Sequence, residues 1–166
     1  MLFRSYTNQV NKALQILEKK PTIYSMDPHD VKEILKSVKE FGRILHKEEK
    51  ADEIYDKLQK RIHNISEILH DKRPTVLAIE WLDPFFTAGH WVPEMIELAG
   101  GTNLISQKGE HSRRMTFDEI EKANPEIIIL MPCGFDVERT TKEYKDRKST
   151  RLNSSHSQQS RMPSSA

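Results

Sequence analysis

The chain has 166 residues, and its 26 Lys and Arg residues against 25 Asp and Glu residues give a formal net charge of +1. This balance gives no reason to expect a nucleic acid as partner, and no apolar run approaches the roughly 20 residues that a membrane helix needs. The single cysteine excludes an internal disulfide. We therefore expect one charge-rich domain, or part of a larger protein.

Two helices are predicted in the first half of the chain. Asp27-Pro28 is typical of a helix start, and apolar residues then recur at helical spacing up to Gly42. A longer helix is predicted from about Glu48 to His70, which at about 1.5 Å per residue spans roughly 30 Å. Its opposite face is charged, as solvated surfaces usually are. Its apolar stripe consists of Ala51, Ile54, Tyr55, Leu58, Ile62, Ile65 and Leu69.

Two apolar strands are predicted in the second half. Pro74 ends the helical region, Thr75–Ile79 reads as a buried strand, and Glu126–Met131 reads as a fully apolar one.

Two short helices are predicted between these strands. Pro93 opens the first helix, and Gly100-Gly101 stops it. The capping box from Thr116 to Glu119 opens the second, which closes at Asn124-Pro125. This alternation of strands and helices predicts an α/β fold with a parallel sheet.

An aromatic segment, EWLDPFFTAGHW, runs from Glu80 to Trp91, has no helical or strand period, and is predicted as a loop. It leaves the carboxyl end of the first strand, and PCGF leaves that of the second. Ligands of open parallel sheets bind beyond this edge, and aromatic walls suit large, flat, partly apolar ligands. Gly89 and Gly134 permit close backbone approach. The aromatic residues of the wall are Trp81, Phe85, Phe86, Trp91 and Phe135. The alternative for Trp81, Phe85 and Phe86 is that each simply covers the sheet edge.

Three other readings use the same residues differently. A bare metal ion would need donors from Glu80, Asp83, His90, Glu94 and Cys133, but no HxH or CxxC spacing is present. Cys133 reads better as a small buried residue. An enzyme would use His90 as a base oriented by Asp83 or Glu80, yet nothing resembles a nucleophile elbow or a phosphate loop. An interaction module would use the charged long helix as a coiled-coil partner.

The runs VLAIEWLDPFFTAGHWVPEMIELAGGTNLI and GEHSRRMTFDEIEKANPEIIILMPCGF resemble the cobalamin-binding substrate-binding proteins of ABC importers. SMDPHDVKEIL and the long helix fit as well, so the resemblance covers nearly all of residues 1–145. The EW-DP-GHWVPE and MPCGF segments are specific to the cobalamin-type branch, whereas the surrounding pattern is shared with proteins that bind iron-siderophore complexes.

The resemblance implies a Rossmann-like lobe and a rigid helix between two lobes, so the chain is expected to be a fragment of a two-lobed protein. Residues 1–46 would be the end of the N-terminal lobe with a connecting helix, 47–73 the inter-lobe helix, and 74–145 part of the C-terminal lobe. The signal or lipid anchor and most of one lobe would be missing. Residues 146–166, DRKSTRLNSSHSQQSRMPSSA, resemble a translated sequencing adapter and are expected to be non-native; a disordered tail is the alternative.

The resemblance also implies binding without catalysis, outside the cytoplasmic membrane, by a monomer that delivers cobalamin or a related corrinoid to permease subunits. No catalytic residue, resident cofactor or protein-bound metal is expected; haem, a siderophore or a bare ion are alternative ligands. The ring would pack on Trp81, Phe85, Phe86 and Trp91, beside Gly89, Cys133, Gly134 and Phe135. Asp83, His90 and Arg113 or Arg114 would bond its peripheral amides. Docking to the permease falls to Asp118, and Glu119 beside it caps the helix or shares that role.

Overall fold

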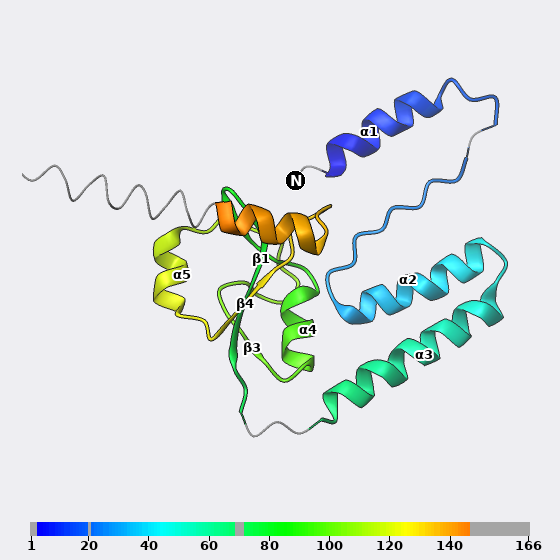
Figure 1. The fold of residues 1–166 in the computed structure, drawn as a ribbon. Helices are drawn as coiled ribbons and strands as arrows, with labels where there is room; N and C mark the ends of the chain where they lie inside the picture. Colours follow the sequence, from blue (N-terminus) through cyan, green and yellow to red (C-terminus); the bar gives the residue numbers. More distant parts are fainter. Residues whose placement is uncertain (1–2, 20, 69–71, 147–166) are drawn as a thin grey trace, which may run out of the picture.

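A computed structural model describes residues 3–19, 21–68 and 72–146 of the chain. Its elements are α1 (Phe3–Leu14), α2 (Val31–Ile44), α3 (Glu48–Ser66), β1 (Thr75–Leu82), β2 (Phe85–Thr87), α4 (Val92–Leu98), β3 (Thr102–Asn103), α5 (Phe117–Ala123) and β4 (Ile127–Leu130). Residues 137–146 are helical as well. Figure 1 shows a small α/β lobe to which the α2–α3 hairpin is attached, with α1 standing apart. No helix in the described ranges is long and apolar enough to cross a membrane.

Strand β1 lies at the centre of the sheet and pairs with every other strand. It pairs with β4 in parallel from Val76–Ile127 to Ile79–Leu130, and with β3 in parallel at its beginning. Its end pairs with β2 in an antiparallel hairpin. The predicted α/β fold with a parallel sheet is therefore confirmed, and β3 is a strand that the sequence pattern did not predict.

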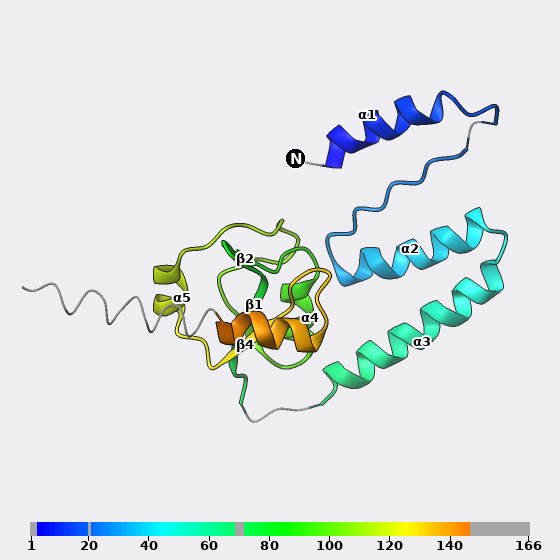
Figure 2. The same cartoon turned by 45° about the horizontal axis from the view of Figure 1, so that its top comes forward.

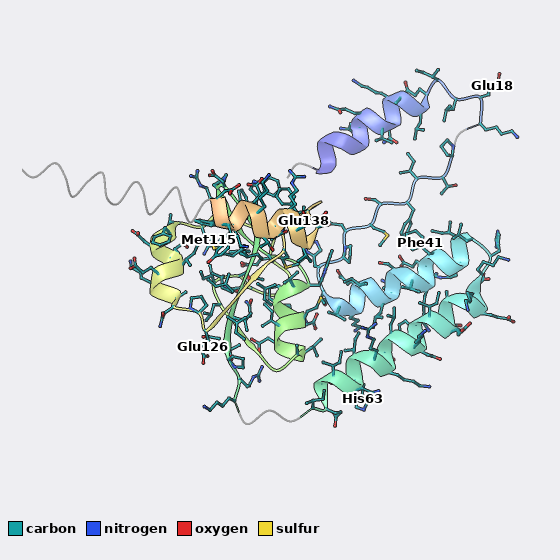
Figure 3. All side chains as sticks on the ribbon, viewed as in Figure 1. Glu18, Phe41, His63, Met115, Glu126 and Glu138 are labelled. Atoms are coloured by element: carbon teal, nitrogen blue, oxygen red, sulfur yellow. The ribbon has the colours of Figure 1, made fainter. Side chains whose placement is uncertain are left out.

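The two faces of β1 bury separate clusters, because successive strand residues point to opposite sides. Val76 and Ala78 pack with Ile96 of α4, whereas Leu77 and Ile79 pack with Met115 and the partly buried Ile120 of α5. Accordingly, α4 and α5 lie on opposite sides of the strands in both views (Figures 1 and 2). Met115 lies inside the lobe among its side chains (Figure 3). The packing of α4 and α5 on its two faces fixes the end of β1, from which the aromatic segment leaves.

The sequence pattern predicted the whole aromatic segment as a loop, but part of it forms strands. Glu80, Trp81 and Leu82 continue β1, and Phe85–Thr87 form β2, with Asp83-Pro84 as the turn between them. A bulge between Ile79 and Trp81 breaks the alternation of the ladder. That irregularity explains why no strand period was visible in the sequence.

The ends of the two long helices differ from the predicted ones. The amino-terminal cap of α2 is Asp30, whose Oδ1 accepts a 2.7 Å hydrogen bond from the Glu33 amide, and not Asp27-Pro28. Helix α2 also continues through Gly42 to Ile44. Helix α3 ends at Ser66, so the prediction to His70 was too long, and residues 69–71 lie outside the described residues. The capping box of Thr116 and Glu119 and the start of α4 beside Pro93 are confirmed.

Helices α2 and α3 form an antiparallel hairpin whose contact depends on a glycine. A Cβ atom on Gly42 would collide with the Cβ of Ala51 and lie 3.2 Å from the Lys47 carbonyl oxygen. Ala51 is buried, but Ile54 and Ile65 of the predicted stripe are about two-fifths exposed. Gly42 is therefore a point of close helix packing and not a helix stop.

Candidate functional site

The candidate site lies at the carboxyl ends of the parallel strands β1 and β4. The Met131 amide donates to the Ile79 carbonyl, so the segments that follow β1 and β4 leave the sheet at the same edge. The segment 109–115 joins them there, since the Thr87 amide donates to the Arg113 carbonyl and the Met115 amide to the Phe85 carbonyl. Three segments distant in sequence thus meet at the edge where α/β sheets bind ligands.

A carboxylate, a hydroxyl and a thiol connect these three segments. The Ser112 hydroxyl donates a 2.6 Å hydrogen bond to Oε2 of Glu80, and the thiol of Cys133 lies 3.9 Å from Oε1 of the same residue. Partial burial of the thiol, together with the negative charge of Glu80, raises the pKa of Cys133. Cys133 is nevertheless an exposed residue and not the buried one expected, because it lies in the turn that follows β4.

The aromatic side chains of the segment divide between the core and the outer edge. Trp81 and Phe86 are cross-strand partners, as are Leu82 and Phe85. Phe85 packs against the core cluster that contains Leu82. This partly buried placement gives Phe85 a structural contact, and its predicted place in the ligand wall stays a prediction.

The outer edge carries an aromatic group with an adjacent cation. The rings of Trp81 and Phe135 meet edge to face at 5.6 Å, and Trp81 is 40% exposed. The indole N–H of Trp81 donates to the Asp83 carbonyl, which fixes the ring. The guanidinium of Arg139 lies 3.6 Å from the centre of the Phe135 ring. Edge-to-face contact and cation–π attraction together hold these rings in one arrangement, and Arg139 was not predicted.

Three histidines from distant segments gather beside this edge. Nε2 of His90 lies 2.9 Å from Nδ1 of His111. The ring of His29 lies 5.6 Å from that of His90 and 5.3 Å from that of His111. Sequence reasoning selected only His90, because three histidines spaced by 61 and 21 residues form no local motif.

The pKa values of His90 and His29 are displaced in opposite directions. Burial, followed by the neighbouring His111 and His29, lowers the pKa of His90. The pKa of His29 is raised, mainly because its Nδ1 lies 3.0 Å from the Gly109 carbonyl oxygen and also because Asp27 is near. Trp91 flanks the group, with its ring 5.8 Å from His90.

The two glycines of the predicted site differ in their surroundings. A Cβ atom on Gly89 would lie 2.6 Å from the Glu110 carbonyl oxygen, so the close approach there is to the chain itself. Gly134 has a φ of +74° and nothing within 4 Å of such an atom. Of these two glycines, Gly134 is the one that leaves open space.

The predicted polar residues are mostly engaged with the protein. Nη1 of Arg113 lies 2.9 Å from Oε1 of Glu119, whose other oxygen accepts a hydrogen bond from the Thr116 amide. The Thr116 amide and Arg113 lower the pKa of Glu119. Arg114 pairs through its backbone with Phe86. Asp118 is exposed on the first turn of α5.

The donor set considered for a bare ion is dispersed. Glu94 accepts from the Val31 amide at 2.8 Å and pairs with Lys108 at 2.5 Å, on the side of α4, whereas Glu80 faces Ser112 and Cys133. Among the residues described, no group of three or more His, Cys, Asp or Glu side chains is arranged to hold a metal ion. A hollow between the end of α3 and α4 is lined by charged residues, among them Arg73, Glu97 and Lys108, and lies away from the aromatic edge.

Comparison with known proteins identifies relatives of this fold. The family model described as periplasmic binding protein matches residues 1–154. No curated protein sequence matches the chain. An ABC transporter substrate-binding protein from Listeria monocytogenes EGD-e superposes with a TM-score of 0.69 at 17% identity, covering 87% of this chain and 57% of that one.

Two further structures are similar and have different ligands in their names. The haem complex of IsdE from Staphylococcus aureus gives a TM-score of 0.69 at 22% identity, over 86% of this chain and 55% of that one. The periplasmic vitamin B12 binding protein BtuF of Vibrio cholerae gives 0.55 at 18% identity, over 75% and 49%. The chain thus spans about half the length of these proteins.

Proposed function

The chain belongs to the periplasmic binding protein family, and from that premise we propose that it is part of a solute-binding protein that captures a corrinoid such as cobalamin for an ABC importer. Capture would take place outside the cytoplasmic membrane, and the loaded protein would deliver its ligand to the permease subunits. The protein acts by binding alone, without chemistry.

The observation that carries this proposal is the aromatic outer edge of the lobe. Trp81, Phe86 and Phe135 come from two segments that leave the same end of the sheet, and Trp81 is 40% exposed. An exposed tryptophan with a fixed ring offers a flat apolar surface at little conformational cost. A corrin ring, which is broad and carries many methyl groups, suits such a surface.

Polar groups beside the aromatic edge would select the periphery of the ligand. His90 and His111 lie next to Trp91, and Ser112 is fixed on Glu80. Hydrogen-bonding groups of this kind suit the amides around a corrin, since a few polar groups in an apolar site fix a ligand's orientation. In this role Asp83 would present its turn backbone, and Arg113, which pairs with Glu119, would have to leave that partner to bond the ligand.

A second candidate ligand is another metal chelate with carboxylates, such as haem or an anionic siderophore. The specific observation in its favour is Arg139, whose guanidinium lies on the Phe135 ring at the aromatic edge. A cation held there would pair with a carboxylate. The similar IsdE structure contains haem, which supports this class, whereas BtuF supports the corrinoid.

Binding of a ligand panel to the protein encoded by the whole gene tests both candidates. Cobalamin and cobinamide would be compared with haemin and a ferric hydroxamate, by calorimetry and by co-elution of the ligand's absorbance. We expect tightest binding of a corrinoid. Tight binding of haemin alone, lost in Arg139→Gln, would replace the first candidate by the second. If none of the panel binds at high micromolar concentration, capture of a metal chelate is refuted.

A further inference from the structure

The proposed function uses His90 and His111 only as hydrogen-bonding groups and does not explain the contact between their rings. These residues lie 21 positions apart, and Nε2 of one faces Nδ1 of the other at 2.9 Å. Neutral imidazole nitrogens are the commonest protein donors to transition metals. Two of them held close together are therefore chemically informative.

The position of His90 is fixed by its backbone. The His90 amide donates to the Glu110 carbonyl at 2.6 Å, and the His90 carbonyl accepts from the Gly109 amide at 2.9 Å. Between these bonds His90 has a φ of 56°, a left-handed conformation that residues with a side chain seldom adopt. The surrounding contacts outweigh this strain, so the imidazole of His90 is presented in advance to His111.

The separation of the two nitrogens matches one particular coordination geometry. Two metal–nitrogen bonds of about 2.0–2.1 Å that meet at a right angle place their nitrogens about 2.9 Å apart, whereas a tetrahedral angle places them about 3.3 Å apart. The observed 2.9 Å equals the right-angled value, which is also the separation of an ordinary hydrogen bond between the two rings. Right angles between nitrogen ligands are typical of square-planar or tetragonal copper(II) and nickel(II).

We propose that Nε2 of His90 and Nδ1 of His111 form a two-nitrogen site for one divalent ion of the copper(II) or nickel(II) type. Water completes the coordination, which agrees with the lack of any three-residue metal group among the described side chains. The ion replaces the proton of the hydrogen bond between the two rings. The ring that donated this hydrogen bond changes tautomer and carries the proton on its other nitrogen. No net proton is released when both rings are neutral.

Two carboxylates near the pair favour a cation. Asp27 and Glu80 act on His90 in the direction that stabilises positive charge, whereas burial and the neighbouring histidines act against it and lower the pKa of His90. His29 is not one of the two ligands, because its nitrogens face the Gly109 carbonyl and Asp27.

The direct test is titration of the chain, without a histidine tag, with NiCl2, ZnCl2 and CuCl2 near neutral pH. We expect one nickel ion to bind by calorimetry, with zinc weaker, and the copper complex to show the hyperfine splitting of two nitrogens in electron paramagnetic resonance. Second-shell changes already cost about 10–100-fold in metal affinity, so His111→Gln and His90→Asn should each weaken binding at least tenfold. Asparagine is chosen at position 90 because it tolerates the left-handed backbone.

The matched control is His63→Gln, which removes an exposed histidine on α3 that pairs only with Glu67 (Figure 3). This variant and His29→Gln should bind nickel within about twofold of the unchanged chain, since neither removes one of the two ligands. If His90→Asn fails to fold, His111→Gln still tests the proposal, because His111 is exposed and its replacement should not disturb the fold.

Three results would overturn the proposal. Nickel binding that survives His111→Gln would leave the contact as an ordinary N–H···N hydrogen bond. Equal loss of binding in His29→Gln would refute a two-nitrogen site. If a corrinoid or haemin binds through one of these histidines while free ions do not, the bare-ion site fails although the proposed function stands.

Discussion

Ser112 donates a 2.6 Å hydrogen bond to the carboxylate of Glu80, across 32 residues of sequence. This contact ties the segment 109–115 to the end of β1, and it leaves the second oxygen of Glu80 3.9 Å from the thiol of Cys133. Since Cys133 follows β4, one carboxylate connects the three segments of the candidate site. The reactivity of the Cys133 thiol therefore depends on the position of Glu80, which all three segments share.

Replacing Glu80 by Gln should make Cys133 more reactive. Burial raises the pKa of the thiol first, and the charge of Glu80 raises it further. Removing that charge lowers the pKa, so more thiolate is present at a given pH and alkylation is faster. The rate of reaction with iodoacetamide against pH measures this, and Cys133 is the only cysteine of the chain. Glu97→Gln, which removes a carboxylate paired with Arg73, should leave the rate unchanged; equal acceleration there would refute the assignment.

The titration of His90 should respond to His29. The pKa of His90 is lowered by burial first, then by His111 and His29. The folded state thus binds fewer protons at His90 than the unfolded chain does, and this contribution weakens the fold as the pH falls below the ordinary pKa of histidine. In His29→Gln the pKa of His90 should rise, but only partly, because its burial remains.

Nuclear magnetic resonance of the imidazole ring, followed against pH, measures that rise. His63→Gln is the control, since His63 lies on α3 and has no part in the shift. An unchanged or lower pKa of His90 in His29→Gln would contradict the coupling of the two rings.

Trp81 and Phe85 should separate ligand binding from stability. Phe85 packs in the core cluster with Leu82, so Phe85→Ala should lower the free energy of unfolding by about 3 kcal/mol. Trp81 is 40% exposed, and under the proposed function Trp81→Ala should weaken corrinoid binding by about 1–3 kcal/mol while the stability changes less. Denaturant unfolding and calorimetry on both variants check this. If Trp81→Ala lowers the stability and Phe85→Ala weakens ligand binding, the two residues have the opposite roles.

The sequence predicted the regular parts of the lobe and missed what depends on contacts between distant segments. The capping box of Thr116 and Glu119 is local, and so it was predictable from four residues. The bulge after Ile79 concealed the end of β1, because a shifted register removes the period of two. The partners of Glu80 and His90 lie 21 to 53 residues away, beyond the reach of any spacing rule.

Helix boundaries failed for a related reason. Asp27 and Asp30 are both capping residue types. Local bonds between Asp30 and Glu33 are joined here by long-range ones, since the Val31 amide donates to Glu94 and His29 contacts Gly109. Gly42 read as a helix stop because glycine commonly ends helices. Its actual role, contact with Ala51, needs the position of the second helix.

Substitution of Gly42 by Ala tests that role. In an unconstrained helix interior, Gly to Ala stabilises by roughly 0.5–1 kcal/mol. Here the added methyl group would collide with Ala51, so we expect a loss of about 1–3 kcal/mol in the free energy of unfolding, as overpacking usually costs. Lys36→Ala on the exposed face of α2 is the control. A stabilised Gly42→Ala in thermal or denaturant unfolding would show that the hairpin is looser than the structure indicates.

Docking to a permease, under the proposed function, should depend on Asp118 and not on its neighbour. Glu119 is occupied twice, by the Thr116 amide and by Arg113, whereas Asp118 is exposed on the same turn of α5. An exposed charge at an interface sets orientation and encounter rate and has little influence on a distant ligand site. Asp118→Arg in the protein encoded by the whole gene should therefore keep ligand affinity but abolish stimulation of the transporter's ATPase in proteoliposomes.

Glu119→Gln provides the contrast on the same helix turn. The pKa of Glu119 is lowered, chiefly by the Thr116 amide, so its carboxylate stabilises the start of α5 above the ordinary pKa of a glutamate, and this contribution is lost as the pH falls through the lowered value. Because glutamine keeps an acceptor but loses the charge that faces Arg113, the variant should fray α5 in hydrogen exchange at neutral pH, yet stimulate the ATPase normally. If Glu119→Gln alone fails to stimulate, the docking residue is Glu119; if both variants stimulate normally, this turn of α5 does not meet the permease.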